Sequence, residues 1–349
     1  RRRGRPAAGE LLFFLVKSAS VGHGSAMLTR PTHRSLRLLP LLASPALAGL
    51  VIALAAVPAC SDGGAASGFS DAGRADGTTG TEDSSVFIPD DASSTATDAA
   101  DGCSDAAKLV YVVTSDDQLY SFDPGALKFT KLLTLNCGSG SATPNSMAVD
   151  RQANAWINYN DGTIWKLDIA TGKCSATAWS KAQKGWLRFG MGFSTNGANT
   201  TDETLFLNPM NELGASNTNG LVKVNLTTMA PTTVGRFTST LSTQSAELTG
   251  TGDGRLYGFF TTTPASLAGI ERTSGATPTV QKLGSLNTGE AWAFSFWGGD
   301  FWFYTANGGN SAVTRLKTAD DTLSTVVANT GMKIVGAGVS TCAPLNGGR

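Results

Sequence analysis

A repeating pattern of strands restricts the fold of this 349-residue chain more than any other feature. Strand-like segments centred on an aromatic residue recur with separations of 45, 50, 51 and 45 residues between the aromatics: Tyr111, Trp156, Phe206, Tyr257 and Trp302. A second series of strands recurs at separations of 45, 57, 46 and 46 residues and ends on Asp123, Asp168, Asn225, Glu271 and Lys317. Two series that keep nearly the same interval indicate one structural unit that is repeated along the chain.

The unit is clearest in residues 146–173, where three alternating strands include a tight turn at Asp161-Gly162 and a fourth strand begins near Cys174. A four-stranded unit with this interval is typical of a β-propeller blade, whose two faces need neighbours to cover them. We therefore predict an all-β, five-bladed β-propeller. Residues 332–340 form one more strand, which we expect innermost in the first blade, closing the ring. A sixth blade between residues 178 and 205 is the alternative count, and a β-sandwich is the competing fold.

The blade interval is similar to that of NHL- or quinoprotein-type repeats, although no specific signature of either family is present. This similarity implies an extracytoplasmic bacterial propeller.

Residues 27–59 have the pattern of an export signal. Residues 1–26 precede Met27, and we interpret them as upstream sequence or an extended leader. From Met27 to residue 59, a basic segment precedes an apolar run that ends in small residues. Val57-Pro58-Ala59-Cys60 resembles a bacterial lipobox, which implies cleavage before Cys60 and a lipid on its thiol. An uncleaved membrane anchor or a plain secretory signal is the alternative. Ser61 stands where Asp often signals inner-membrane retention, so we expect anchoring in the outer membrane of the cell envelope.

Residues 60–102 are expected to form a disordered acidic tether. They are dominated by Gly, Ala, Ser, Thr and Asp, and such a composition buries too little apolar surface to offset the entropy of ordering. The short apolar run Val86-Phe87-Ile88 has no predicted role there. Residues 103–345 form the predicted propeller, and residues 103–349 carry 18 basic and 17 acidic residues. This balance provides no basic stripe for nucleic acid.

The cysteine count fits an exported protein with disulfides. Once Cys60 is assigned to lipid, four cysteines remain, and they can pair in three ways. Cys103 and Cys342 bracket the propeller, so a bond between them would join its ends. That choice leaves Cys137 to pair with Cys174, both near the ends of outer strands in adjacent blades. Free buried thiols are the alternative.

Histidine chemistry is excluded from the expected mature chain, because the two histidines, His23 and His33, lie in the leader. Ser-His-Asp hydrolysis and His-ligated metal sites therefore do not apply. No P-loop or dinucleotide fingerprint is present. The chemistry that remains is that of carboxylates and of oxygen-ligated metals. We expect no cofactor, with Ca²⁺ as the alternative.

Five residues are candidates for ligand binding on the face of the channel. Asn145, Glu247 and Glu290 lie before or at the start of inner strands, where side chains can point to the channel mouth. Glu212 lies in the amide-rich loop of residues 208–219, and Trp186, in a connection between blades, is expected to be exposed. The dense aromatics of residues 292–304 suggest a sugar-stacking platform, but inner strands are packed on both faces, so we interpret most of these rings as core and keep the platform as the alternative.

The leading hypothesis for function is a lipid-anchored binding or scaffold module of the cell envelope. It would recognise a protein or glycan partner through the channel face, touch the membrane through its lipid, and bind no nucleic acid. The alternative is a carboxylate- and Ca²⁺-dependent hydrolase or lyase, for which propeller lactonases of the senescence-marker-protein type are the precedent. A surface structural protein with no discrete ligand is a further alternative.

Overall fold

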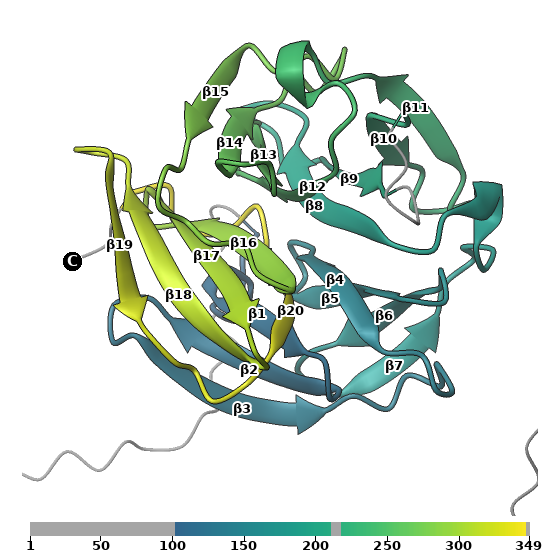
Figure 1. Cartoon of the computed structure of the whole chain (residues 1–349). Helices are drawn as coiled ribbons and strands as arrows, with labels where there is room; N and C mark the ends of the chain where they lie inside the picture. Colours follow the sequence, from purple (N-terminus) through teal and green to yellow (C-terminus); the bar gives the residue numbers. More distant parts are fainter. Residues whose placement is uncertain (1–101, 211–217, 347–349) are drawn as a thin grey trace, which may run out of the picture. The chain divides into compact units, whose positions relative to one another are not determined.

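The computed structural model describes residues 102–210 and 218–346. In these residues twenty strands form five four-stranded antiparallel sheets, arranged as the blades of a β-propeller (Figure 1). The five-bladed, all-β prediction is confirmed, and the sixth blade is not, because residues 189–195 form the innermost strand of the third sheet. The predicted leader and signal peptide, and the tether up to residue 101, lie outside the described residues. None of the helices in the described ranges has the length and apolar character of a membrane span.

The strand bounds follow the predicted repeat. Blade 1 contains β20 (Ile334–Val339), β1 (Val110–Thr114), β2 (Gln118–Asp123) and β3 (Lys128–Thr134). Blade 2 contains β4 (Pro144–Val149), β5 (Asn154–Tyr159), β6 (Ile164–Asp168) and β7 (Lys173–Ala176). Blade 3 contains β8 (Phe189–Thr195), β9 (Glu203–Pro209), β10 (Leu221–Val224) and β11 (Pro231–Gly235). Blade 4 contains β12 (Ala246–Gly250), β13 (Leu256–Phe260), β14 (Ser266–Gly269) and β15 (Thr279–Lys282). Blade 5 contains β16 (Ala291–Trp297), β17 (Asp300–Asn307), β18 (Asn310–Lys317) and β19 (Thr322–Val327).

The recurring aromatic residue fills the wedge between its own blade and the next one. Buried apolar side chains form one cluster at each of the five interfaces between adjacent blades. The aromatic of every second strand contributes to the cluster shared with the following blade: Tyr111, Trp156, Phe206, Tyr257 and Trp302. Because a blade is exposed on two faces until it is stacked, these large rings supply the apolar area that holds neighbouring blades together.

The second recurring position has a local role in the turn between the third and outer strands. The Asp123 carboxylate accepts hydrogen bonds from the backbone N–H groups of Gly125 and Ala126. Asp168 and Asn225 cap the corresponding turns of blades 2 and 3 in the same way. The recurring Asp and Asn residues are therefore explained by turn geometry.

The ring is closed by the C-terminal strand and by a disulfide. Strand β20 pairs antiparallel with β1, as predicted for residues 332–340. Cys103 bonds Cys342 with the two Cα atoms 5.8 Å apart. Cys137 bonds Cys174 with a Cα separation of 5.0 Å and ties the end of blade 1 to the outer strand of blade 2. Both preferred pairings are confirmed, and the alternative of free thiols is wrong.

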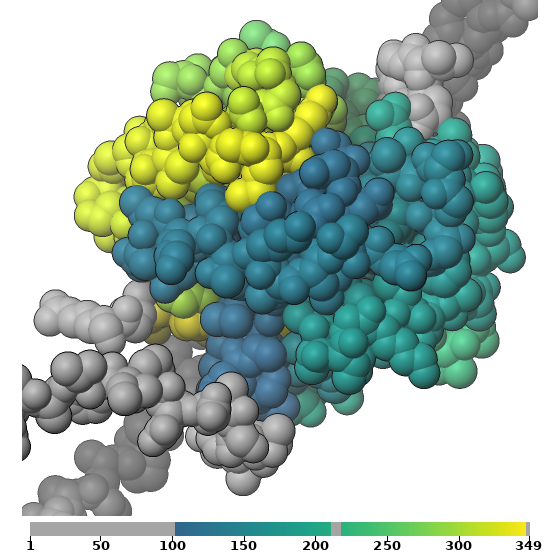
Figure 2. Space-filling view, turned by 90° about the horizontal axis from the view of Figure 1, so that it is seen from below, coloured from purple at the N-terminus to yellow at the C-terminus, as the bar shows by residue number. Residues whose placement is uncertain are grey.

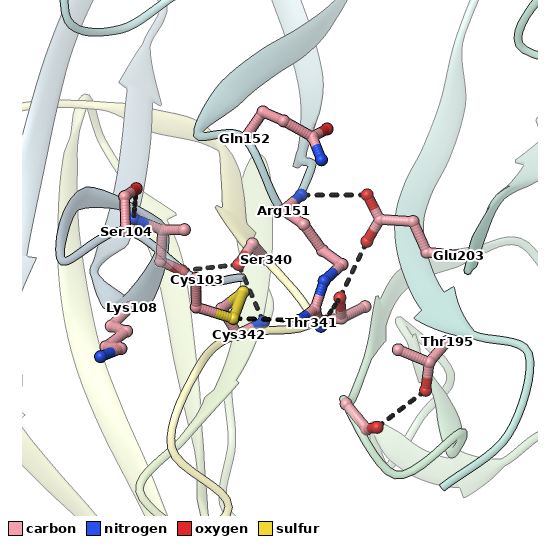
Figure 3. Close-up of a disulfide and its surroundings, with 12 residues drawn as sticks. Cys103, Ser104, Lys108, Arg151, Gln152, Thr195, Glu203, Ser340, Thr341 and Cys342 are labelled. Carbon is pink, nitrogen blue, oxygen red and sulfur yellow. Dashed lines mark hydrogen bonds between the residues drawn. A yellow bond between two sulfur atoms is a disulfide. The ribbon is translucent and has the colours of Figure 1, made fainter. Parts of the chain in front are cut away.

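A buried polar network surrounds the closing disulfide (Figure 3). The Arg151 guanidinium donates hydrogen bonds to Cys103 Sγ at 3.1 Å and to Thr341 Oγ1 at 3.3 Å. Glu203 accepts from the Arg151 backbone N–H at 2.9 Å and from Thr341 Oγ1 at 2.8 Å. Burial raises the pKa of Glu203 to about 7. Thr341 follows β20, Arg151 follows β4 and Glu203 begins β9, so the network joins blades 1, 2 and 3.

The central channel is narrow because the inner strands approach one another closely. A Cβ added at Gly190 would lie 2.0 Å from the Ala246 carbonyl oxygen of the next blade. At Gly336 it would meet the backbone of Ser146 at 3.0 Å. The absence of a side chain at both positions permits this packing.

Candidate functional site

The mouth of the channel holds a pocket of about 600 Å³, and all five blades contribute residues to it. This volume lies within the usual range for small-molecule sites. Its lining is rich in side chains with hydroxyl or amide groups: Ser115, Thr143, Asn145, Asn160, Thr243, Gln244, Ser245 and Thr261. The half-buried Trp292 is the single aromatic residue among the lining residues given by the described part of the chain.

An ion pair crosses the pocket between blades 5 and 1. Lys333 Nζ lies 3.0 Å from Glu290 Oε2, and the hydrogen bond from this ammonium lowers the pKa of Glu290. Glu290 immediately precedes β16 and Lys333 immediately precedes β20, so both lie at the entry of inner strands. Arg188, just before β8, adds a second cation to the lining. The pocket thus has both charged and neutral hydrogen-bonding groups.

Glu247 is the buried acid of the pocket. It is the second residue of β12 and is only 4% exposed, yet it belongs to the lining. Its Oε2 accepts a hydrogen bond from Ser146 Oγ at 2.6 Å, and its carboxylate also accepts one from the Met191 backbone N–H. Burial is the largest influence and raises the pKa of Glu247 to about 8, against these two hydrogen bonds. The carboxyl group is therefore mostly protonated at pH 7 and can act as a hydrogen-bond donor.

Asn145 is held in place by a second asparagine. Its Nδ2 donates to Asn158 Oδ1 at 3.0 Å. Asn158 is fully buried, and its Oδ1 also accepts from the backbone N–H of Phe189, the first residue of the next inner strand. Because Asn158 fixes both the strand entry and the Asn145 amide, the Asn145 side chain is pre-organised at the pocket wall.

Three of the five predicted ligand-binding residues converge on this pocket: Asn145, Glu247 and Glu290. Glu212 lies outside the described residues. The expectation of an exposed Trp186 is wrong, because that side chain is 8% exposed and belongs to the apolar cluster between blades 2 and 3. Trp179, from the same connection, is buried beside it and donates from Nε1 to the Gly162 carbonyl at 3.0 Å. This connection between β7 and β8 fills the wedge between two blades.

Comparison with known proteins finds only solved structures of low sequence identity and low TM-score. No family model and no curated protein sequence matches the chain. Among solved structures, a streptogramin B lyase is similar with a TM-score of 0.35 and 17% identity, over 61% of this chain and 66% of that one. A protein of unknown function from Bacteroides thetaiotaomicron has a TM-score of 0.40 and 14% identity, over 63% of this chain and 55% of that protein. TolB from Acinetobacter baumannii has a TM-score of 0.39 and 12% identity, over 66% of this chain and 54% of TolB.

The chain thus spans between about half and two thirds of the length of these three solved proteins. At such TM-scores the similarity assigns no function. The fold of this chain is established by its own strand order and pairing.

The interpretation of most blade 5 aromatics as core is confirmed, whereas Trp292 is half-buried and lines the pocket. Phe294, Phe303 and Tyr304 are at most 2% exposed. Trp292 is the second residue of β16, so it lies at the entry of an inner strand, and it belongs to the lining of the pocket. Glu247 is likewise the second residue of an inner strand, β12. The same position in the repeat could therefore have identified Trp292 as a pocket residue from the sequence.

The carboxylates of the described residues do not gather into a metal site. No group of three or more His, Cys, Asp or Glu side chains converges within residues 102–210 and 218–346. A Ca²⁺ site in a protein uses six to eight oxygen ligands, commonly from several carboxylates. The Ca²⁺-dependent alternative therefore gains no support from this part of the chain.

Proposed function

We propose that this protein is an extracytoplasmic binding module that takes the end of a glycan, or a similar polyhydroxylated ligand, into the channel-mouth pocket. The observation that carries the proposal is the lining of the pocket, in which eight hydroxyl or amide side chains surround a half-buried Trp292. Hydroxyl and amide groups donate and accept in turn, as sugar hydroxyls do, and an indole offers an apolar face for the C–H side of a sugar ring. The two disulfides are typical of a protein that folds in an oxidising compartment.

Removal of the Trp292 indole or of the Asn145 amide should weaken glycan binding at least tenfold, as expected when about 1.4 kcal/mol or more of binding free energy is lost. The test is a glycan array probed with the full chain, followed by calorimetry with the best glycan on the Trp292→Ala and Asn145→Ala variants.

Gln152→Ala is the matched control, because this exposed amide follows β4 at the end opposite to Asn145. Its affinity should equal that of the wild type. An array without any bound glycan, or equal affinity for all four proteins, would exclude the glycan proposal.

Lipid attachment at Cys60 is the proposed means of holding the module at the cell envelope, preferably at the outer membrane. It rests on the lipobox resemblance, and Cys60 lies outside the described residues. In a bacterial host, Cys60→Ala should abolish incorporation of a labelled fatty acid and move the protein from the membrane fraction to the soluble periplasmic fraction. Labelling that persists in Cys60→Ala would contradict lipidation at this residue.

A hydrolase or lyase is the second candidate, and Glu247 is the feature that favours it. A carboxyl group with a pKa of about 8 at the wall of a pocket can donate a proton to a leaving group at neutral pH. Conversion of a bound glycan during calorimetry, lost in Glu247→Gln, would favour the enzyme over the binding module.

A further inference from the structure

The two disulfides have different surroundings. Cys137 belongs to the apolar cluster between blades 1 and 2, and Cys174 packs against this cluster from within β7. Cys103 and Cys342 lie outside the strands, before β1 and after β20, and belong to the buried polar network of Arg151. The rate of thiol–disulfide exchange depends on access to the sulfur atoms and on the stability of the thiolate that leaves. The two bonds should therefore differ in reactivity.

Arg151 places a positive charge beside the sulfur of Cys103. Its guanidinium donates to Cys103 Sγ at 3.1 Å and to Thr341 Oγ1 at 3.3 Å (Figure 3). Arg151 is only 7% exposed, so little water screens this charge from the sulfur. Glu203 of the same network offsets only part of the charge at neutral pH, because burial raises its pKa to about 7. A guanidinium next to a cysteine favours the thiolate, so Cys103 is suited to be the leaving group when the bond breaks.

Cys342 is the more accessible cysteine of this pair. It is half-buried, whereas Cys103 is 3% exposed. In Figure 2 the last part of the described chain, in yellow, lies beside its first part, in blue, at the surface, as expected from the pairing of β20 with β1. An attacking thiolate therefore reaches the sulfur of Cys342, while the sulfur of Cys103 lies against Arg151. This is the division between attacked sulfur and leaving sulfur that exchange requires.

Other contacts hold the chain on both sides of this bond. Strand β20 pairs with β1, and the Ser340 hydroxyl donates to the Ala107 carbonyl oxygen at 2.6 Å. Trp297 Nε1 donates to the Lys108 carbonyl oxygen at 2.8 Å. Attack at the closing disulfide therefore needs no unfolding of a blade. Attack at the other disulfide is hindered, because its Cys174 is held in the pairing of β7 with β6.

We propose that Cys103–Cys342 is a site of reversible thiol–disulfide exchange with a dithiol reductant. One thiolate of the dithiol attacks Cys342 Sγ and forms a mixed disulfide, and the electron pair of the broken bond leaves on Cys103 Sγ beside Arg151. The second thiol of the dithiol loses its proton and attacks the mixed disulfide, which releases Cys342 as a protonated thiol. The dithiol becomes a disulfide, this chain gains two electrons, and one proton passes to solvent. None of these residues lines the channel-mouth pocket, so the proposal is independent of glycan binding.

Reduction of the folded full chain by dithiothreitol tests the proposal. Samples are quenched with iodoacetamide at intervals, and mass spectrometry gives the reduction rates of both disulfides in the same sample. At neutral pH we expect Cys103–Cys342 to be reduced at least about tenfold faster than Cys137–Cys174. Arg151→Met should slow reduction of Cys103–Cys342 at least about threefold, because the leaving thiolate loses its cation. Arg151→Lys keeps a cation and should recover most of the rate.

Lys173→Met is the matched control, because it removes an exposed cation next to Cys174, at the other disulfide. It should leave the reduction rate of Cys103–Cys342 unchanged. Equal rates for the two disulfides of the wild type would overturn the proposal. Equal rates at Cys103–Cys342 in Arg151→Met and Arg151→Lys would overturn it too, since the charge would then have no effect on the leaving sulfur.

A second measurement decides the case in which Arg151→Met unfolds the chain and both disulfides become accessible. In Cys342→Ser, Cys103 is a free thiol, and its thiolate absorbs in the ultraviolet. Subtraction of the spectrum of the Cys103→Ser/Cys342→Ser double variant isolates this absorbance. We expect Cys103 to be mostly thiolate at neutral pH. A mostly protonated Cys103, as for an ordinary cysteine with a pKa of about 8.5, would overturn the proposal.

Discussion

Replacement of both Cys103 and Cys342 by serine should lower the free energy of unfolding by about 5 kcal/mol, because their bond closes a loop with a sequence separation of 239 residues. The bond restricts the unfolded chain, and this entropic effect grows with the logarithm of loop length. The same argument for Cys137 and Cys174, separated by 37 residues, gives about 4 kcal/mol. Guanidinium unfolding of the two double-serine variants at one pH measures both losses.

Serine is the suitable replacement at Cys103 because it leaves a hydrogen-bond acceptor for the Arg151 guanidinium, which now bonds the sulfur at 3.1 Å. The closing strand β20 and the Arg151–Thr341–Glu203 network remain in place in this variant. The Cys103/Cys342 double-serine variant should lose more unfolding free energy than the Cys137/Cys174 one. If it loses the same or less, strand pairing and this network close the ring without help from the disulfide.

Replacement of Glu247 by glutamine should remove most of a fall in stability that the wild type shows as pH rises from about 5 to 8. The pKa of Glu247 is 4.5 in an ordinary, solvated setting and about 8 when buried in the fold. Between these values the folded protein holds a proton that the unfolded chain has released. The free energy of unfolding therefore decreases with rising pH, by at most about 1.4 kcal/mol per pH unit, or about 4 kcal/mol over three units.

Glutamine is neutral at every pH and keeps an oxygen that can accept from Ser146 Oγ and the Met191 N–H. Glu247→Gln should thus resemble the wild type at pH 5 and exceed its stability at pH 8. Glu203, with a pKa near 7, contributes a slope of the same sign between pH 4.5 and about 7, so some slope should remain in this variant. Glu290→Gln is the control, since Lys333 holds the pKa of Glu290 below this window. Guanidinium unfolding at pH 5, 6.5 and 8 measures the slopes, and equal slopes for Glu247→Gln and the wild type would disprove the assignment.

The repeat predicted the architecture well because a propeller is built from local contacts. Strands within a blade are neighbours in the sequence, and each blade contacts the next one, so a regular interval of aromatics translates directly into stacked sheets. The disulfides followed from the same logic, since Cys103 and Cys342 bracket the repeat. In blade 3, where the interval lengthens to 57 residues, the strands still form because the additional residues lie in connections.

The site was predictable only where strand entry alone decides the position of a side chain. Asn145, Glu247 and Glu290 lie at the pocket, as predicted for side chains at the entry of inner strands, because these strands begin at one end of the channel. Trp186 was misplaced because the sequence does not show that the connection of residues 177–188 turns its indoles into the wedge between blades 2 and 3.

The sequence by itself predicted the all-β class and the closing strand, and its spacing favoured five blades and the Cys103–Cys342 pairing, while the tertiary structure decided the blade count and the two cysteine pairs. Only the tertiary structure decided that Glu247 is buried against Ser146 while Glu290 is paired and exposed, and that Trp292 rather than Trp186 lines the pocket. These outcomes depend on contacts between blades that are about 45 to 100 residues apart in the sequence. Burial and electrostatic environment arise from that long-range packing, and local periodicity carries no information about it.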